Sequence, residues 1–217
     1  VDAVFISVPV PPAEAGQDLS ALILSVQMAK RFTDKVFIRS TVLPGTNDRL
    51  KTISCPEFLT ARHADRDMMN LPILVGACDP AFVSEIFTGK IIISMSNVEA
   101  ELAKFTHNCF GALKVTYFNM VSQLSGIIGA DYGNVLQGAM MTGFIESEHT
   151  MVPGPDGKFG YGGACYPENM EAMKNFLSFV GLQFEYDFFR NVQAMNRLYR
   201  NEIAQISSHD SHGEIDA

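Results

Sequence analysis

The spacing of apolar residues divides the chain into two regions of different periodicity. Up to about residue 96, short apolar runs typical of buried strands alternate with stretches of helical spacing. The expected strands are residues 4–8, 35–42, 53–58, 73–76 and 91–95. Strands that alternate with helices predict a parallel α/β sheet. The first run, Val4-Phe5-Ile6-Ser7-Val8, is continuous and so predicts a strand buried on both faces.

Helices between these strands have recognisable first turns. Asp18 can cap a helix, because its carboxylate can accept from free N–H groups. The apolar stripe of that helix is Leu19, Leu22, Ile23, Val26 and Ala29. Residues 48–52 fit a short helix, and Asp79-Pro80 is typical of the start of another.

The second region begins with a long uninterrupted helix. From Val98 to Gly129 there is no proline, and helical periodicity predicts about 30 residues spanning about 45 Å. The expected stripe is Leu102, Phe105, Cys109, Leu113, Phe118 (or Val115), Val121, Leu124 and Ile128. Phe105, Phe110, Phe118 and Met120 point in different directions, and one small domain cannot bury all of them. We therefore expect a homodimer that forms through the helix at 98–129.

The rest of the chain contains further helices and one long loop. Helices are expected at residues 131–141, 167–180 and 187 to about 206, with a polar tail at 207–217. Residues 142–165 are irregular and rich in Gly and Pro. In a compact protein such a long loop is usually functional.

Composition narrows the class of protein. The 217 residues are 47% hydrophobic and 18% charged, which is enough for a buried core. The net charge of −8 argues against binding to nucleic acid or to a membrane surface. No apolar run approaches the length of a transmembrane helix. The four cysteines have no paired spacing and no zinc-ligand pattern, so we expect free thiols, no metal and a cytoplasmic location.

The strongest local signal for chemistry is the segment Gly160-Tyr161-Gly162-Gly163-Ala164-Cys165-Tyr166-Pro167. Glycines let the backbone approach a ligand or turn with positive φ. Free N–H groups at the start of the helix that Pro167 opens favour a thiolate, which makes Cys165 a candidate nucleophile. The pattern alone fits a buried structural cysteine equally well.

Two weaker signals lie elsewhere. Lys104 and Asn108 share a face of the long helix and can donate to a developing oxyanion, although an exposed Glu101–Lys104 pair is the commoner explanation. Thr41 and Glu57 end predicted strands, where open parallel sheets bind ligands, although both residues also suit turns.

Five motifs in order resemble the UDP-glucose/GDP-mannose dehydrogenase family. They are Val-Phe-Ile-Ser-Val before proline, Ser-Thr-Val-x-Pro-Gly-Thr, Pro-Glu-Phe-Leu, Ala-Glu-Leu-x-Lys-Phe-x-x-Asn and Val-Pro-Gly-Pro-Asp-Gly-Lys-x-Gly-Tyr-Gly-Gly-x-Cys-x-Pro. The resemblance implies half of a Rossmann-like NAD-binding domain at 1–96, a helical domain for dimerisation and substrate at 97–206, and a flexible tail at 207–217. We expect the family's pyrophosphate-binding glycine turn upstream of Val1 and its C-terminal domain downstream of the chain.

The resemblance also implies a reaction, the NAD-dependent oxidation of the C6 alcohol of a UDP-sugar such as UDP-glucose to the uronate. Cys165 matches the residue that attacks the intermediate aldehyde, giving a thiohemiacetal and then a thioester. Lys104 and Asn108 match oxyanion donors, and Glu57 matches a glutamate that acts through water. The implied cofactor contacts are Val10, Pro11 and Thr41. The implied nucleotide-sugar contacts are Phe58, Leu59, Lys104, Asn108, His149, Tyr161 and Gly162.

Three positions depart from the family pattern. Asn169 stands where the family has an aspartate that assists proton transfer, Ala61 replaces a glutamate, and Phe144-Ile145-Glu146 replaces Arg-Ile-Gly. An amide cannot act as a general base, and losing such a group lowers rates roughly 10²–10⁴-fold. A degenerate, non-catalytic relative that serves as a dimerising or binding module is therefore the alternative to an enzyme weakened at these positions.

Overall fold

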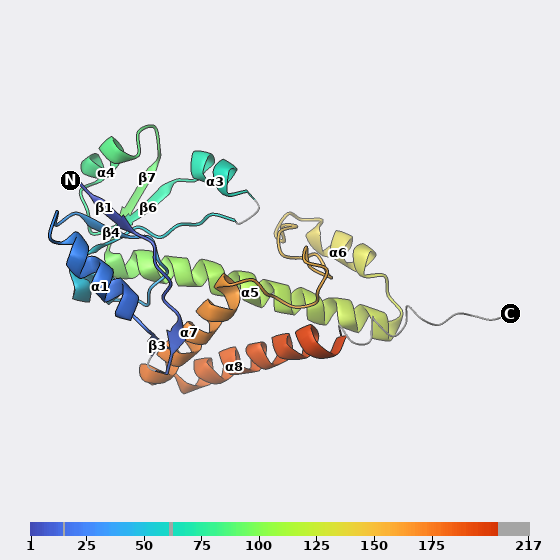
Figure 1. The fold of residues 1–217 in the computed structure, drawn as a ribbon. Coiled ribbons are helices and arrows are strands. Elements are labelled where there is room, and N and C mark those ends of the chain that lie inside the picture. The colour runs from blue at the N-terminus through green and yellow to red at the C-terminus, as the bar shows by residue number, and fades with distance from the viewer. Residues whose placement is uncertain (15, 61–62, 204–217) are drawn as a thin grey trace. The chain divides into compact units, whose positions relative to one another are not determined.

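The computed structural model describes residues 1–14, 16–60 and 63–203 (Figure 1). Ala61 and the expected tail at 207–217 lie outside the described residues. The chain divides into two compact units. The first is Val1–His107 with Glu171–Val180, and the second is Asn108–Met170 with the segment from Gly181 onward. The domain boundaries expected from the sequence, near residues 97 and 207, stay predictions.

The first unit contains parallel strands, as the sequence predicts. Its three-stranded sheet has the order β1 (Val4–Ile6), β4 (Val36–Ile38), β5 (Ile53–Ser54), and a separate parallel pair consists of β6 (Ile73–Gly76) and β7 (Ile92–Met95). Val4 pairs with Val36, and Phe37 pairs with Ile53. An antiparallel pair of two-residue strands, β2 (Pro12–Ala13) and β3 (Gly16–Gln17), was not predicted. The predicted α/β class is confirmed.

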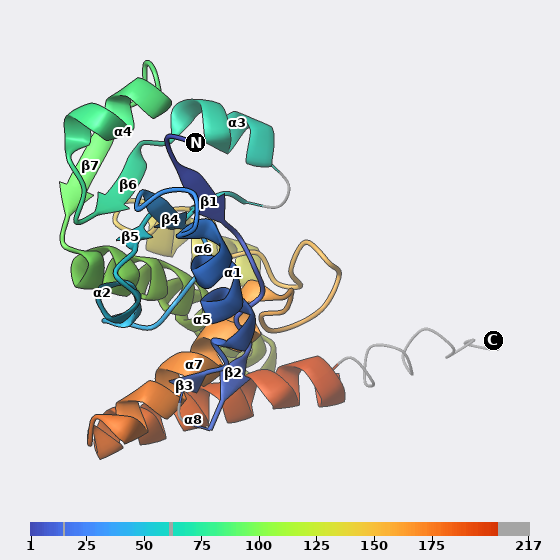
Figure 2. The same ribbon diagram turned by 60° about the vertical axis from the view of Figure 1, so that its left-hand side comes forward.

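The helices of the first unit are α1 (Ser20–Ala29), α2 (Thr46–Leu50), α3 (Ala64–Asn70) and α4 (Pro80–Ile86). The sequence predicts all but α3. Leu22 and Val26 of α1 belong to one core cluster with Ile6, Val36 and Ile38 of the sheet. Helix α1 lies beside β1 (Figure 2). Asp79 caps α4 by accepting from the Ala81 N–H at 3.0 Å. Leu19, not Asp18, occupies the N-cap position of α1, and Asp18 accepts from the Ser20 N–H at 2.9 Å.

The prediction that β1 is buried on both faces is wrong for the described structure. Ile6 is buried, but Phe5 on the opposite face is 39% exposed. The Phe5 ring stacks on Phe37 with centroids 4.8 Å apart and meets Phe87 edge-on at 5.6 Å. The alternation of exposed and buried side chains is that of a sheet covered more fully on one face.

Helices make up most of the second unit. The long helix is α5 (Asn97–Ile128), whose first turns belong to the first unit. It is followed by α6 (Tyr132–Met140), the irregular segment 141–164, α7 (Cys165–Phe179), α8 (Gln183–Leu198) and a π-helical turn, η1 (Tyr199–Ile203). The part of α7 from Glu171 onward belongs to the first unit. The expected elements are confirmed, with one shift that matters for the site: α7 begins at Cys165 and not at Pro167.

The buried face of α5 differs from the predicted apolar stripe. Phe105, Cys109 and Phe118 are buried as expected, but Leu102, Leu124 and Ile128 are exposed. Polar side chains occupy much of the buried face instead. They are Asn97, Glu101, Lys104, Asn108, Thr116, Asn119 and Ser125. Apolar periodicity alone therefore identified only part of the buried side of this helix, because that side is partly polar.

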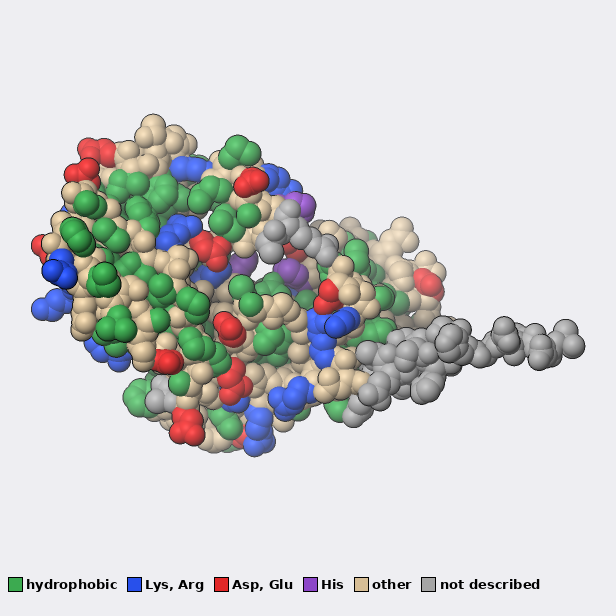
Figure 3. Space-filling model, viewed as in Figure 1, with side chains coloured by type: hydrophobic (Ala, Val, Ile, Leu, Met, Phe, Trp, Pro, Cys, Tyr) green, Lys and Arg blue, Asp and Glu red, His purple; other side chains and the backbone are tan. Residues whose placement is uncertain are grey.

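Two further observations concern the charge of the surface and the hydropathy of the helices. Acidic and basic side chains are interspersed over the face drawn in Figure 3. Within the described ranges, no helix combines the length and the apolar character needed to cross a bilayer.

Candidate active site

Cys165 is the exposed thiol of the chain. It is the first residue of α7, whereas Cys55 and Cys109 are buried and Cys78 is half-buried. The alternative in which Cys165 is a buried structural cysteine is therefore wrong. Burial raises the pKa of the Cys109 thiol to about 12. Burial also raises the pKa of the Cys55 thiol, although the nearby Arg39 guanidinium acts in the opposite direction and lowers it. These buried thiols are poor nucleophiles at neutral pH.

Asn169 lies one turn after Cys165 on α7 and contacts its backbone. The Asn169 Nδ2 donates to the Cys165 carbonyl at 2.6 Å. Its Oδ1 accepts from Nδ2 of Asn108 on α5 at 3.4 Å, and both asparagine side chains are buried. The structure thus brings Cys165, Asn108 and Asn169 together in the second unit. Asn169 acts there as a hydrogen-bond bridge and not as a base.

His149 and Tyr166 form a hydrogen-bonded pair beside this group. The Tyr166 hydroxyl lies 2.9 Å from His149 Nε2, and the rings meet edge-on at 5.7 Å. Gly111 of α5 lies against the Tyr166 hydroxyl, and a β-carbon there would collide with it. Burial lowers the pKa of His149, which favours the neutral imidazole. Sequence reasoning named His149 but missed the role of Tyr166.

Phe144, Ile145 and Glu146, which replace Arg-Ile-Gly of the family pattern, help to line an apolar hollow of about 500 Å³ in the second unit. Phe144 is 91% exposed at its edge, so its ring is not part of the core. Lys114 Nζ donates to the Glu146 carbonyl at 2.9 Å. The other lining residues are Phe110, Leu113, Tyr117 and Phe118.

Lys104 and Glu57 meet in the first unit. Lys104 Nζ lies 3.8 Å from Glu57 Oε1 and 4.9 Å above the centre of the Phe58 ring. Lys104 is only 5% exposed. Glu57 is partly exposed, and its other oxygen accepts from the Leu59 N–H at 2.7 Å. Four residues named from the sequence, Glu57, Phe58, Leu59 and Lys104, are thus brought together.

Glu101 does not form the exposed pair with Lys104 that the sequence allows as an alternative. Glu101 is 2% exposed, and its carboxylate accepts from the Gly45 N–H at 2.6 Å and from the Asn47 N–H and Nδ2, each at 2.7 Å. Burial raises its pKa, opposed by the hydrogen bonds from Asn47 and Gly45. Glu101 therefore anchors the loop that follows Thr41 to the start of α5.

Gln17 and Ser40 join the loops that follow β1 and β4. Gln17 Nε2 donates to the Thr41 carbonyl at 3.0 Å and to the Val10 carbonyl at 3.4 Å. The Ser40 hydroxyl accepts from the Val8 N–H at 2.9 Å and donates to the Val8 carbonyl at 2.7 Å. The expected cofactor residues Val10 and Thr41 are thereby brought together at the carboxyl ends of parallel strands. Gln17 was missed because nothing in its local sequence marks it.

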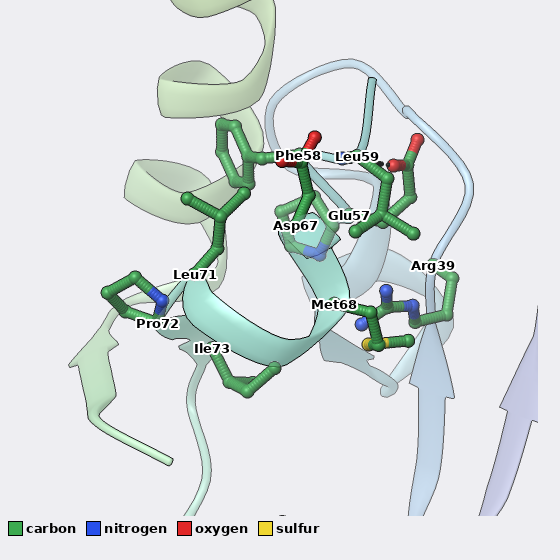
Figure 4. Close-up of a pocket in the computed structure, with 10 residues that line it drawn as sticks. Arg39, Glu57, Phe58, Leu59, Asp67, Met68, Leu71, Pro72 and Ile73 are labelled. Atoms are coloured by element: carbon green, nitrogen blue, oxygen red, sulfur yellow. Dashed lines mark hydrogen bonds between the residues drawn. The ribbon is translucent and has the colours of Figure 1, made fainter. Parts of the chain in front are cut away.

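A small pocket opens beside Glu57 (Figure 4). Its volume of about 20 Å³ has room for about one water molecule, so it is not a site for a sugar or a nucleotide. Arg39, Glu57 and Asp67 contribute polar side chains to its lining. Among the described residues, no group of three or more His, Cys, Asp or Glu side chains is placed to hold a metal ion.

The expected site residues divide between the two units. Thr41, Glu57, Phe58, Leu59 and Lys104 belong to the first unit. Asn108, His149, Tyr161, Gly162, Cys165 and Asn169 belong to the second.

Comparison with known proteins gives a consistent result. Residues 98–198 match the model of the UDP-glucose/GDP-mannose dehydrogenase family, central domain. The UDP-glucose 6-dehydrogenase of Rickettsia typhi is 28% identical over 96% of this chain and 52% of its own length. A putative UDP-glucose 6-dehydrogenase of Bacillus subtilis is 26% identical over 79% of this chain and 45% of its own length. The chain thus spans about half the length of these curated relatives.

Solved structures agree. A UDP-glucose dehydrogenase from Pyrobaculum islandicum superposes with a TM-score of 0.78 at 27% identity, covering 90% of this chain and 50% of that one. A UDP-D-ManNAc dehydrogenase from Pyrococcus horikoshii shares the fold, with a TM-score of 0.75 at 19% identity over 91% of this chain and 50% of its own. The resemblance seen in the motifs is confirmed: residues 98–198 match the central-domain model of the UDP-glucose/GDP-mannose dehydrogenase family, and the relatives and solved structures that match the chain are nucleotide-sugar dehydrogenases.

Proposed function

We propose that the protein is an NAD-dependent nucleotide-sugar 6-dehydrogenase in which Cys165 is the nucleophile. The observation that carries the proposal is the contrast among the thiols: Cys165 is exposed on the first turn of α7, directly after a glycine-rich loop, whereas Cys55 and Cys109 are buried. A thiolate can attack an aldehyde and later leave from an acyl group, so one side chain serves both oxidations.

The strand ends that carry Val10, Pro11 and Thr41 suit one wall of a nicotinamide site. The Thr41 side chain is half-buried, and within the described part of the chain its hydroxyl has no hydrogen-bond partner. Such a hydroxyl fits the polar edge of a nicotinamide or its ribose, at the strand ends where open α/β sheets bind ligands. When bound, NAD⁺ supplies a two-electron acceptor for each oxidation.

In this proposal each protein group has one task in the chemistry. The Cys165 sulfur forms a bond to the aldehyde carbon, and the carbonyl oxygen gains the charge that Lys104 and Asn108 stabilise. After oxidation to the thioester, water attacks the acyl carbon and the Cys165 thiolate leaves with the electron pair of the C–S bond. Glu57, partly exposed and next to Lys104, takes a proton from that water. Phe58, Leu59, His149, Tyr161 and Gly162 are proposed as substrate contacts.

We further propose that the chain forms a homodimer through α5. Apolar residues that face away from the core follow a seven-residue repeat: Phe110, Leu113, Tyr117, Met120, Leu124 and Ile127. All but Leu113 are exposed in the single chain. A stripe of six apolar residues spaced by three and four is typical of a helix that packs against another helix.

The direct test uses the full-length gene product, because the chain spans only part of its relatives' length. NADH formation is measured with UDP-glucose, UDP-N-acetyl sugars and GDP-mannose. We expect turnover with one of the UDP-sugars, and Cys165→Ser is expected to abolish uronate formation. Cys78→Ser, which removes the other partly exposed thiol, is the matched control and should retain activity. No NADH with any of the sugars would refute the proposal.

One observation favours a second candidate, a non-catalytic dimerising or binding module. Asn169 stands where the family has an acid/base residue, and the nitrogen and the oxygen of its amide are each engaged in a hydrogen bond, to Cys165 and from Asn108. Mass spectrometry separates the two candidates. A working but slowed enzyme accumulates a Cys165 acyl adduct in the presence of substrate and NAD⁺, whereas a non-catalytic relative forms none.

A further inference from the structure

Side chains from outside the glycine loop hold its backbone. The Gly160 N–H donates to Oδ1 of Asn119 on α5 at 2.9 Å. The Tyr161 N–H donates to Oδ1 of Asn196 on α8 at 2.7 Å, and Asn196 Nδ2 donates back to the Tyr161 carbonyl at 3.0 Å. Asn119 and Asn196 are both buried, so water does not compete for these bonds.

Arg200, in the turn after α8, adds a contact from the same side. Its Nε donates to the Tyr161 carbonyl at 2.9 Å, and its Nη1 donates to Asp156 Oδ2 at 2.7 Å. The hydrogen bond from Arg200 is the main cause of the lowered pKa of Asp156. Because Asp156 precedes the glycines in the same irregular segment, Arg200 joins two points of that segment. Asn119, Asn196 and Arg200 are called the loop cradle below.

The glycines lie where the cradle leaves no space for a side chain. A β-carbon on Gly160 would collide with Oδ1 of Asn196, and one on Gly162 would collide with the Arg200 guanidinium. Gly160 also has a φ of 70°. At Gly163, by contrast, the β-carbon position is open and only the φ of 74° requires glycine. At two of the three glycines, Gly160 and Gly162, the missing side chain therefore leaves the space that a cradle side chain occupies.

We infer that Asn119, Asn196 and Arg200 are positioning residues for Cys165. Three residues, Gly162, Gly163 and Ala164, separate the last held backbone group, the Tyr161 carbonyl, from Cys165, so the cradle fixes the chain one short stretch before the thiol. A nucleophile must be held within about 0.5 Å of its productive place, and misplacement by about 1 Å can lower the rate about 100-fold. The catalytic part of this inference rests on the proposed function, whereas the holding of the loop does not.

The first measurement needs no activity. Amide hydrogen exchange of the segment around Gly160 and Tyr161 is compared between the natural chain and Asn196→Ala, which removes an acceptor and a donor. Exchange should accelerate at least about 10-fold, because the Tyr161 N–H loses its partner. Asn175→Ala is the matched control, since Asn175 also donates to a backbone carbonyl, that of Ala13 at 2.8 Å, but in the other unit. Arg200→Ala is a milder second variant if Asn196→Ala does not fold.

The second measurement separates positioning from mere stability. In the full-length gene product, Asn196→Ala should lower kcat for UDP-glucose oxidation about 10–100-fold, while KM changes less than about threefold. Asn196→Asp keeps the acceptor for the Tyr161 N–H, and Arg200 still donates to the Tyr161 carbonyl. The kcat of this conservative variant should therefore be at least about threefold higher than that of Asn196→Ala.

The outcomes distinguish the inference from the proposed function. Unchanged loop exchange, or faster exchange with an unchanged kcat, would overturn the cradle as a positioning device. If the natural enzyme oxidises none of the nucleotide sugars, the proposed function fails, and the alkylation rate of Cys165 by iodoacetamide decides instead. A change of at least about threefold in Asn196→Ala, absent in Asn175→Ala, then supports positioning. An unchanged rate overturns it.

Discussion

The side-chain amide of Asn169 donates a 2.6 Å hydrogen bond to the backbone carbonyl of Cys165, one helical turn before it. Its oxygen accepts from Asn108, so both ends of the amide are used. A carboxylate cannot donate to a carbonyl, and the residue that the family pattern has at this position could not make the same bond when ionised. The substitution therefore exchanges a base for a clamp on the backbone of Cys165.

Asn169→Asp should accordingly change stability and turnover in opposite directions. At neutral pH the unfolding free energy should fall by about 1–3 kcal/mol, because an ionised carboxylate faces the Cys165 carbonyl. Such a contact raises the carboxyl pKa in the folded state, so the loss should grow as the pH rises and shrink in acid, where the protonated group can donate. In the full-length protein, thioester hydrolysis should accelerate about 10–100-fold, less than a general base can give, because Glu57 is proposed to take part of that role.

Urea unfolding at pH 5 and pH 8 and steady-state NADH formation measure the two effects. Asn175→Asp is the control, because it also replaces an amide that donates to a backbone carbonyl. It should lose stability without gaining turnover. A rate that stays at zero in Asn169→Asp would favour the non-catalytic module.

Iodoacetamide should label Cys165 before the other three thiols. Burial raises the pKa of Cys109 to about 12, and it also raises the pKa of Cys55 and Cys78. At pH 8 a thiol with a pKa of 12 is ionised to about one part in 10⁴, compared with about a quarter for an ordinary thiol. Peptide mapping over time should therefore show Cys165 first, Cys78 next, and Cys55 and Cys109 last.

Denatured protein provides the control for that labelling order, because unfolding should bring all four rates to similar values. Folded-state labelling of Cys109 as fast as Cys165 would remove the basis for naming Cys165 as the nucleophile.

Glu101→Ala should destabilise the first unit by at least about 3 kcal/mol. The change leaves the Gly45 N–H and two donors of Asn47 buried without an acceptor. Glu99→Ala removes an exposed carboxylate two residues earlier on the same helix and should have a much smaller effect. Chemical denaturation of the two variants is the measurement, and equal losses would contradict the anchoring role of Glu101.

Tyr117→Glu should dissociate the proposed dimer, because it puts a charge near the middle of the apolar stripe. We expect dimer affinity to fall at least about 30-fold, the loss typical of a central interface residue. Gln123→Glu adds the same charge at an exposed position that flanks the stripe, where paired helices tolerate charges, and should leave the dimer intact. Light scattering of the natural chain at micromolar concentration must show a dimer, and a monomer would refute the proposal.

Acidification should loosen the segment around His149. Burial lowers the pKa of His149, so the unfolded chain takes up this proton at a higher pH than the folded chain does. The stabilisation is therefore present above the ordinary histidine pKa of about 6.5 and is lost as the pH falls below it. The protection of backbone amides near His149, taken relative to their intrinsic exchange rates at each pH, should fall between pH 7 and pH 5. His149→Gln should lack that change.

Much of the fold could be predicted because the first region of the chain follows local rules. Apolar runs that end at Pro or Gly became strands, and the stretch without proline became α5. The face of α5 could not be predicted, because Glu101, Asn108 and Asn119 are buried through partners far along the chain, which apolar periodicity cannot detect.

The same distinction separates the predicted from the missed parts of the site. Cys165 lies within a local motif, so its neighbours mark it. Asn119 and Asn196 contact the glycine loop from positions 41 and 35 residues away, and each looks like an ordinary polar residue of a helix. Gly160 and Gly162 were correctly singled out, but the reason for them became visible only with the side chains that fill the space beside them.

The seven-residue repeat on α5 has a geometric consequence. A straight α-helix has 3.6 residues per turn, so a stripe with a period of 3.5 drifts by about 20° around the helix with each repeat. Two copies that keep their stripes in register must wind around each other with a left-handed supercoil and cross at a shallow angle of about 20°. Contact would then run along the helix as a narrow seam, and Tyr117, near its middle, would lose more on substitution than Phe110 or Ile127 at its ends.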